Sequence, residues 1–266
     1  MNQAEIILLT SFPADTTPER LAEYQECLRR NAEYEHIGQI KLFLEGDERS
    51  RQSVAKPWKQ CSKVQIIPIN KRATLNQLFD YAKQKLKGKY VVVCNADIWF
   101  DQESNLDRIV EIRKGAMWAL TRCKHDPVAN QWVAAFPSYF GSYDSYLFKS
   151  PIKEIDVGCE LEMGRYGCDT YLASKALLSG IQVANPAYSI ISKHLHDVAI
   201  KSHHWYSETH KKKMTYWELP DYGIIKRSPP LTRIEQEQYL KPRPKWQLLA
   251  RYHLYRRPKS YIKLKF

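Results

Sequence analysis

The chain has 266 residues with a formal net charge of +12, and 44% of them are hydrophobic, which suffices for the core of one large domain. No stretch approaches the roughly 18 uninterrupted apolar residues of a membrane-spanning helix. The short apolar run at 6–9 lacks the features of a secretion signal. The six scattered cysteines exclude a zinc ribbon and a dense disulfide scaffold. We therefore expect a cytoplasmic protein, soluble or peripheral at the inner face of a membrane.

Strand and helix signals alternate through the first half of the chain. The predicted strands are 5–10, 40–44, 64–69 and 90–94, and the last of them is almost entirely apolar. Thr17 and Thr74 are suited to begin helices as N-caps, because apolar residues recur at helical spacing after each of them. This alternation favours an α/β fold with a mostly parallel sheet that is buried on both faces.

The pattern loosens after residue 115. We predict a further strand over 117–121, a helix over 169–179, and late strands over 181–183 and 189–196. The intervening residues 123–166 are rich in aromatic residues, Gly and Pro. Long irregular stretches inside compact domains often carry function.

The residues that follow the predicted strands are the first candidates for a ligand site, because parallel sheets bind ligands at the carboxyl ends of their strands. These residues are Thr10, Ser11, Glu45, Arg72, Asn95 and Asp97. Arg72 also precedes a helix N-terminus, which suits a diphosphate. Loops are polar in any protein, so this placement alone decides little.

Asp97 is the strongest of these candidates, because an apolar strand runs directly into Asn95-Ala96-Asp97. A carboxylate at a sheet edge can hold a divalent cation through hard oxygen ligands. Such a cation can bridge the phosphates of a nucleotide diphosphate and offset the charge of its departure. The alternative is that Asp97 only caps the following turn.

Two further polar segments lie later in the chain. His194 and His196 share one face if their segment is a strand, and imidazole is a good Mn²⁺ ligand. Asp144 follows a loop that begins at Gly141, and aromatic residues stand near it, a combination that suits the binding of a sugar. The alternative for Asp144 is a surface loop that runs into a strand.

Asn95-Ala96-Asp97 at the end of an apolar strand resembles the DxD motif of GT-A glycosyltransferases, and the resemblance covers about residues 4–204. It implies a GT-A fold, a nucleotide-diphosphate-sugar donor, and Mn²⁺ or Mg²⁺ held mainly by Asp97. Asn95 departs from the motif, so we expect weaker metal affinity. Its amide can still hydrogen-bond a ribose or sugar hydroxyl.

The resemblance also implies roles for other positions. Thr10-Ser11-Phe12 resembles the edge that receives the base and ribose. Asp169 resembles the acidic residue that takes the proton from the acceptor hydroxyl in inverting members, although Asp is also a favoured helix N-cap. His196 resembles the late histidine that completes the metal shell, with His194 beside it or on the diphosphate.

The resulting prediction is a catalytic domain over 1–240, with a nucleotide-binding half at 1–115 and an acceptor and catalytic half at 116–240. The acceptor would be a glycan or glycolipid, as in polysaccharide biosynthesis. Residues 241–266 form a basic aromatic tail with nine Lys and Arg residues and no Asp or Glu. An amphipathic helix of this composition suits an anionic membrane, and its alternative is packing on its own domain.

Three other functions stay open. A nucleic-acid-binding protein would use the basic tail, but it leaves Asn95-Ala96-Asp97 unexplained. A sugar nucleotidyltransferase is disfavoured because Ser11-Phe12-Pro13 stands where a glycine-rich phosphate loop would be expected. The third is a transferase-like protein that only binds its ligand.

Overall fold

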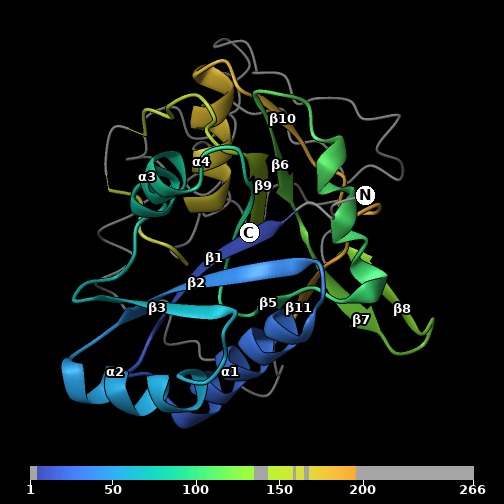
Figure 1. Ribbon diagram of the computed structural model, residues 1–266. Helices are drawn as coiled ribbons and strands as arrows, with labels where there is room; N and C mark the ends of the chain where they lie inside the picture. The colour runs from blue at the N-terminus through green and yellow to red at the C-terminus, as the bar shows by residue number, and fades with distance from the viewer. Residues whose placement is uncertain (1–4, 135–142, 158–159, 165–167, 196–266) are drawn as a thin grey trace, which may run out of the picture.

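The computed structural model describes residues 5–134, 143–157, 160–164 and 168–195, and its centre is a seven-stranded sheet with the order β10-β6-β9-β4-β1-β2-β3 (Figure 1). The strands are β1 (Ile6–Pro13), β2 (Ile37–Glu45), β3 (Val64–Ile69), β4 (Tyr90–Cys94), β6 (Ala116–Leu120), β9 (Ser145–Lys149) and β10 (Gln182–Ala184). Neighbouring strands pair in parallel except that β9 runs antiparallel to β4 and β6. The predicted mostly parallel sheet is confirmed.

Within the described residues, four α-helices cover the two faces of this sheet. They are α1 (Pro18–Glu33), α2 (Glu48–Ala55), α3 (Leu75–Lys85) and α4 (Cys168–Leu178). Thr17 and Thr74 are the N-caps of α1 and α3, as predicted. Helix α2 was not predicted, because Val54 is its only buried residue and it therefore shows no apolar periodicity.

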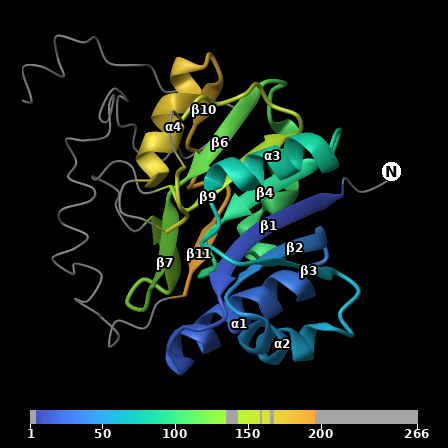
Figure 2. The same ribbon diagram turned by 90° about the vertical axis from the view of Figure 1, so that its left-hand side faces the viewer.

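The helices lie in two layers, with α1 and α2 on one side of the sheet and α3 and α4 on the other (Figures 1 and 2). Alternate side chains of β1 point to the two faces of the sheet. Ile6 and Leu8 belong to the core under α1 and α2, whereas Ile7 and Leu9 belong to the core under α3 and α4. A strand buried on both faces must be apolar throughout, which explains the continuous apolar run.

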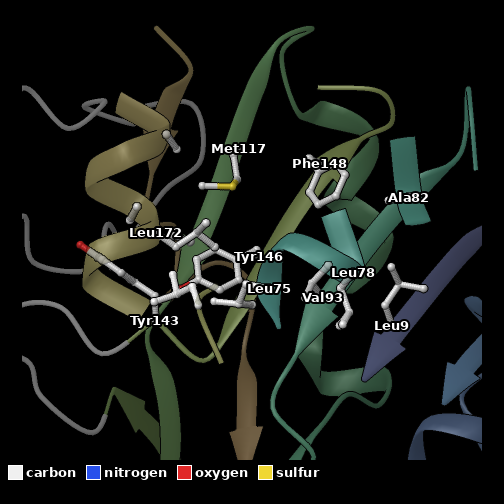
Figure 3. Packing of buried hydrophobic residues seen from close by; sticks show 14 of the residues in the cluster. Leu9, Leu75, Leu78, Ala82, Val93, Met117, Tyr143, Tyr146, Phe148 and Leu172 are labelled. Carbon is white, nitrogen blue, oxygen red and sulfur yellow. The ribbon is translucent and has the colours of Figure 1, made fainter. Parts of the chain in front are cut away.

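The core on the α3 and α4 side is shown in Figure 3. Leu75 and Leu78 of α3 and Leu172 of α4 are directed toward the sheet residues Val93 and Met117, and all five are almost completely buried. This packing fixes the starts of α3 and α4 near the ends of the strands.

The cap of α3 permits a direct stability test. Thr74 Oγ1 accepts a hydrogen bond from the backbone N–H of Gln77 at 3.2 Å. We expect Thr74→Ala to lower the free energy of unfolding by about 1 kcal/mol, because one backbone donor of the first turn loses its partner. Urea denaturation measures this. Thr74→Ser keeps the hydroxyl and is the matched control; equal losses in both variants would contradict a capping role.

A second sheet with the order β5-β11-β7-β8 lies beside the carboxyl ends of the parallel strands, the edge of the first sheet that is called the ligand edge below. Its strands are β5 (Ile98–Trp99), β7 (Arg122–Asp126), β8 (Gln131–Ala134) and β11 (Ser192–His194). Within the described residues, β11 is all that is seen of the strand predicted over 189–196. It pairs with β5 so that His194 lies opposite Ile98, next to Asp97 in the chain.

Three short 3₁₀ helices complete the described elements, namely η1 (Lys56–Trp58), η2 (Gln102–Ser104) and η3 (Leu106–Glu111). Among the helices of the described part, none has the length and apolar character needed to cross a bilayer. The predicted tail at 241–266 and the domain boundary before it lie outside the described residues.

Candidate functional site

Asp97 lies in the turn between β4 and β5 and is 7% exposed. Its Oδ2 accepts a hydrogen bond from Nη2 of Arg20 at 2.5 Å and lies 3.3 Å from Nε2 of His194. Its Oδ1 is buried and has no hydrogen-bond partner among the described residues. Burial by itself raises the pKa of Asp97, but His194 and Arg20 outweigh burial and hold that pKa below its ordinary value. Asp97 is therefore ionised at neutral pH.

Arg20, in the first turn of α1, is the main partner of Asp97 and was not predicted. Its guanidinium also donates to Glu23, its Nε donates to the Tyr24 hydroxyl at 3.0 Å, and it lies 4.7 Å from the centre of the Tyr24 ring. Burial by itself lowers the pKa of Arg20. Asp97 and Glu23 raise it by more than burial lowers it, so the side chain stays charged. The signal that could have found Arg20 is its place on a helix that starts at the ligand edge, just after the first strand.

Asn95 and Asp144 meet at the same edge. Asn95 Nδ2 donates to Oδ1 of Asp144 at 2.9 Å, and the Asn95 backbone N–H donates to the Asp144 carbonyl at 3.0 Å. Asp144 precedes β9, whose antiparallel direction brings its first residues to the carboxyl ends of β4 and β6. The structure therefore places Asp144 in a buried polar cluster rather than in a surface loop.

Arg122 completes this cluster and was also missed. Its Nη1 donates to Oδ1 of Asp144 at 3.2 Å, and the Asp144 side chain is 5% exposed while that of Arg122 is 29% exposed. Arg122 stands two residues after the end of β6. The rule applied to the first four strands, which looks at residues just after a strand, would have found it.

Asp169 lies in the first turn of α4, near the same edge. Its Oδ2 accepts a hydrogen bond from the backbone N–H of Tyr143 at 2.9 Å, and its carbonyl accepts one from the Tyr146 hydroxyl at 2.9 Å. A small pocket joins Asp169 to Asn95 and Asp144. Its other lining residues are Leu75, Val93, Cys94, Tyr143, Tyr146, Met163 and Cys168.

The side chains near the end of β1 have internal partners. Ser11 Oγ lies 2.7 Å from the Phe43 carbonyl and 2.8 Å from Oε1 of Glu45, and that oxygen also accepts the backbone N–H of Ala73 at 3.1 Å. Ser11 and Glu45 thus tie β1, β2 and the start of α3 together.

Thr10 and Phe12 are buried as well, at 4% and 1% exposure. The Phe12 ring stacks on Tyr24 with 5.3 Å between ring centres, so this side chain belongs to the core. The predicted contacts of this segment with a base and ribose stay a prediction.

Arg72 and His196 are the remaining predicted residues. Arg72 is partly buried, and its Nη1 donates to the Met163 carbonyl at 3.4 Å. Burial raises the pKa of Tyr24, and the charges of Arg20 and Arg72 both oppose this rise. His196 lies outside the described residues. Within the described part, no group of three or more His, Cys, Asp or Glu side chains is placed to hold a metal ion.

Comparison with known proteins gives the fold. No family model and no curated protein matches the chain. Among solved structures, the mannosyltransferase PcManGT from Pyrobaculum calidifontis in complex with GDP-Man and Mn²⁺ is 14% identical, with a TM-score of 0.50 over 76% of this chain and 59% of that one. S. aureus TarS 1–349 in complex with UDP-GlcNAc is 8% identical, with a TM-score of 0.50 over 74% of this chain and 61% of that one.

These likenesses confirm the predicted GT-A fold class, with its Rossmann-like sheet flanked by helices. This chain spans only about 60% of the length of the two solved structures. At these low identities the comparison shows the fold, and the roles of individual residues rest on the geometry above.

Proposed function

We propose that the protein is a glycosyltransferase that moves a sugar from a nucleotide-diphosphate donor to a glycan or glycolipid acceptor. The observation that carries the proposal is the convergence of Asn95, Asp97, Asp144, Asp169 and His194 on the carboxyl edge of the sheet. The solved structures with a similar fold hold GDP-Man in one case and UDP-GlcNAc in the other. A ligand of this class, bound at the strand ends, fits the general rule for open α/β sheets.

Asp169 is the proposed general base of an inverting transfer. It would take the proton from the acceptor hydroxyl while that oxygen attacks the anomeric carbon of the donor sugar. The Tyr143 backbone N–H holds one carboxylate oxygen in place, and the start of α4 favours the ionised form. Asn95 and Asp144 line the small pocket beside Asp169, and in the proposal they would bind sugar hydroxyls.

The nucleotide half of the site would be 1–115. Thr10, Ser11, Phe12 and Glu45 line the ends of β1 and β2, where a base and ribose would bind, and Arg72 would contact the diphosphate. The acceptor would be a glycan or glycolipid, and the basic aromatic tail at 241–266 would contact an anionic membrane surface.

The predicted Mn²⁺ or Mg²⁺ can be tested against the residues present. Asp97 is a hard oxygen ligand, it is ionised, and its buried Oδ1 lacks a partner among the described residues. His194 Nε2 lies 3.3 Å from its other oxygen. These two residues fit a divalent cation, with His196 as the third proposed ligand. A bound cation would neutralise the charge that develops on the departing diphosphate.

Nucleotide binding tests the proposal directly. We expect UDP or GDP, or one of their sugars, to raise the melting temperature, because a ligand at 100 times its Kd stabilises the folded state by about 2.7 kcal/mol. Thermal-shift measurement with and without Mn²⁺ reports this, with AMP and single-stranded DNA as controls. Stabilisation by the DNA but by none of the nucleotide diphosphates would favour the nucleic-acid-binding alternative.

A further inference from the structure

Arg20 lies where a cation would meet Asp97. Its Nη2 is 2.5 Å from Asp97 Oδ2, and the two side chains are only 19% and 11% exposed. A guanidinium carries a full positive charge at any physiological pH. Arg20 and a divalent cation at Asp97 would therefore repel each other through a partly buried, weakly screened space.

Arg20 also has partners that do not depend on Asp97. Glu23 and Tyr24 follow it by three and four residues on α1, so both side chains lie on the same side of the helix. Glu23 pairs with the guanidinium. The Tyr24 hydroxyl accepts a hydrogen bond from its Nε, and the Tyr24 ring lies against its flat face. These contacts would hold the guanidinium in its position on α1 if another cation bound to Asp97.

Carboxylate oxygens beside Arg20 can also accept such a cation. Two buried carboxylates, Asp97 at 7% and Glu23 at 9% exposure, both pair with Arg20. Oδ1 of Asp97 is also buried without a hydrogen-bond partner among the described residues. A buried carboxylate oxygen needs a donor, a water molecule or a cation, so this oxygen is available to a cation that enters the site.

We propose that Arg20 is an internal counter-ion: it neutralises Asp97 in the empty site and competes with the divalent cation for that carboxylate, while Glu23 retains it once the cation is bound. Arg20 thereby sets the metal affinity of the site. The inference rests on the proposed function for the identity of the cation. It adds a positioning role for Arg20 that acts through Asp97.

Mn²⁺ titration followed by electron paramagnetic resonance tests the competition in the full chain. We expect Arg20→Gln to bind Mn²⁺ about tenfold more tightly than wild type, or more, because the competing charge is gone. Arg29→Gln is the matched control, since Arg29 lies on the same helix with a half-exposed side chain whose salt bridges in the described part are with Glu26 and Glu33. Glu23→Gln should act in the opposite direction and weaken Mn²⁺ binding, because Arg20 then loses one carboxylate partner and pairs more strongly with Asp97.

Thermal melting gives a second readout that does not need turnover. Arg20→Gln removes the guanidinium from the buried Asp97, so the variant should melt below wild type in EDTA and gain more from Mn²⁺ than wild type does. The double variant Arg20→Gln, Asp97→Asn should show no gain from Mn²⁺.

Equal or weaker Mn²⁺ binding by Arg20→Gln overturns the inference, and so does an absence of Mn²⁺ binding in every variant. Neither result touches the proposed function, which stands or falls on whether wild type binds UDP or GDP. If wild type fails to bind nucleotides but the variants show the expected Mn²⁺ affinities, the cation site is supported and the proposed glycosyltransferase function is contradicted.

Discussion

Replacing Asp169 with asparagine is expected to lower the rate of sugar transfer by about 10²–10⁴-fold and to leave the affinity for the nucleotide diphosphate near wild type. Asparagine keeps a side-chain oxygen that can accept the Tyr143 backbone N–H, so the start of α4 should retain its structure. The amide cannot take a proton from the acceptor hydroxyl. Single-turnover release of UDP or GDP measures the rate, and calorimetry measures the affinity.

Asp80→Asn is the matched control for this experiment, because Asp80 is an exposed residue of α3 away from the ligand edge. It should leave both rate and affinity unchanged. A transfer rate near wild type in Asp169→Asn would place the base elsewhere. A loss of nucleotide affinity would instead make Asp169 a structural residue of the donor site.

Asp97→Asn is expected to abolish Mn²⁺ binding and to lower the free energy of unfolding by about 3 kcal/mol, since a buried ion pair loses one partner. The loss should lie at the low end for such pairs, because Glu23 still neutralises Arg20. Urea denaturation at neutral pH measures the stability.

The same variant predicts a pH dependence. The pKa of Asp97 is lowered in the folded protein, so its ionised form contributes stability above the unfolded-state pKa of about 3.9, and this contribution is lost as the pH falls below that value. The difference in free energy of unfolding between wild type and Asp97→Asn should therefore be full at neutral pH and shrink below about pH 4. A difference that is constant over this range would show that Asp97 does not carry the ion pair.

The helices and strands of the first half followed from local signals. The caps Thr17 and Thr74 and the apolar strand 90–94 are features of a few neighbouring residues, and the structure confirms each of them. Short elements escaped prediction where such signals are weak. Helix α2 buries only Val54, and β7 buries only Cys123.

The candidate site was predicted less completely than the fold. Asn95, Asp97 and Asp169 were identified from their positions after a strand or at the start of a helix, and Asp144 from the glycine loop and aromatic residues around it. The structure brings them to one edge. Arg20 was missed because nothing near it in the chain reveals its partner. Asp97 lies 77 residues away, and the two meet only because β1 and β4 are neighbours in the sheet.

The amino-acid sequence alone determined the alternation of elements, the burial of the sheet on both faces and the polar residues at the strand ends, because hydrophobic period and capping act over a few residues. The tertiary structure decided which charges meet. The antiparallel strand β9 brings Asp144 beside Asn95, and the pairing of β11 with β5 brings His194 beside Asp97. Such contacts depend on strand order and direction, which no local pattern specifies.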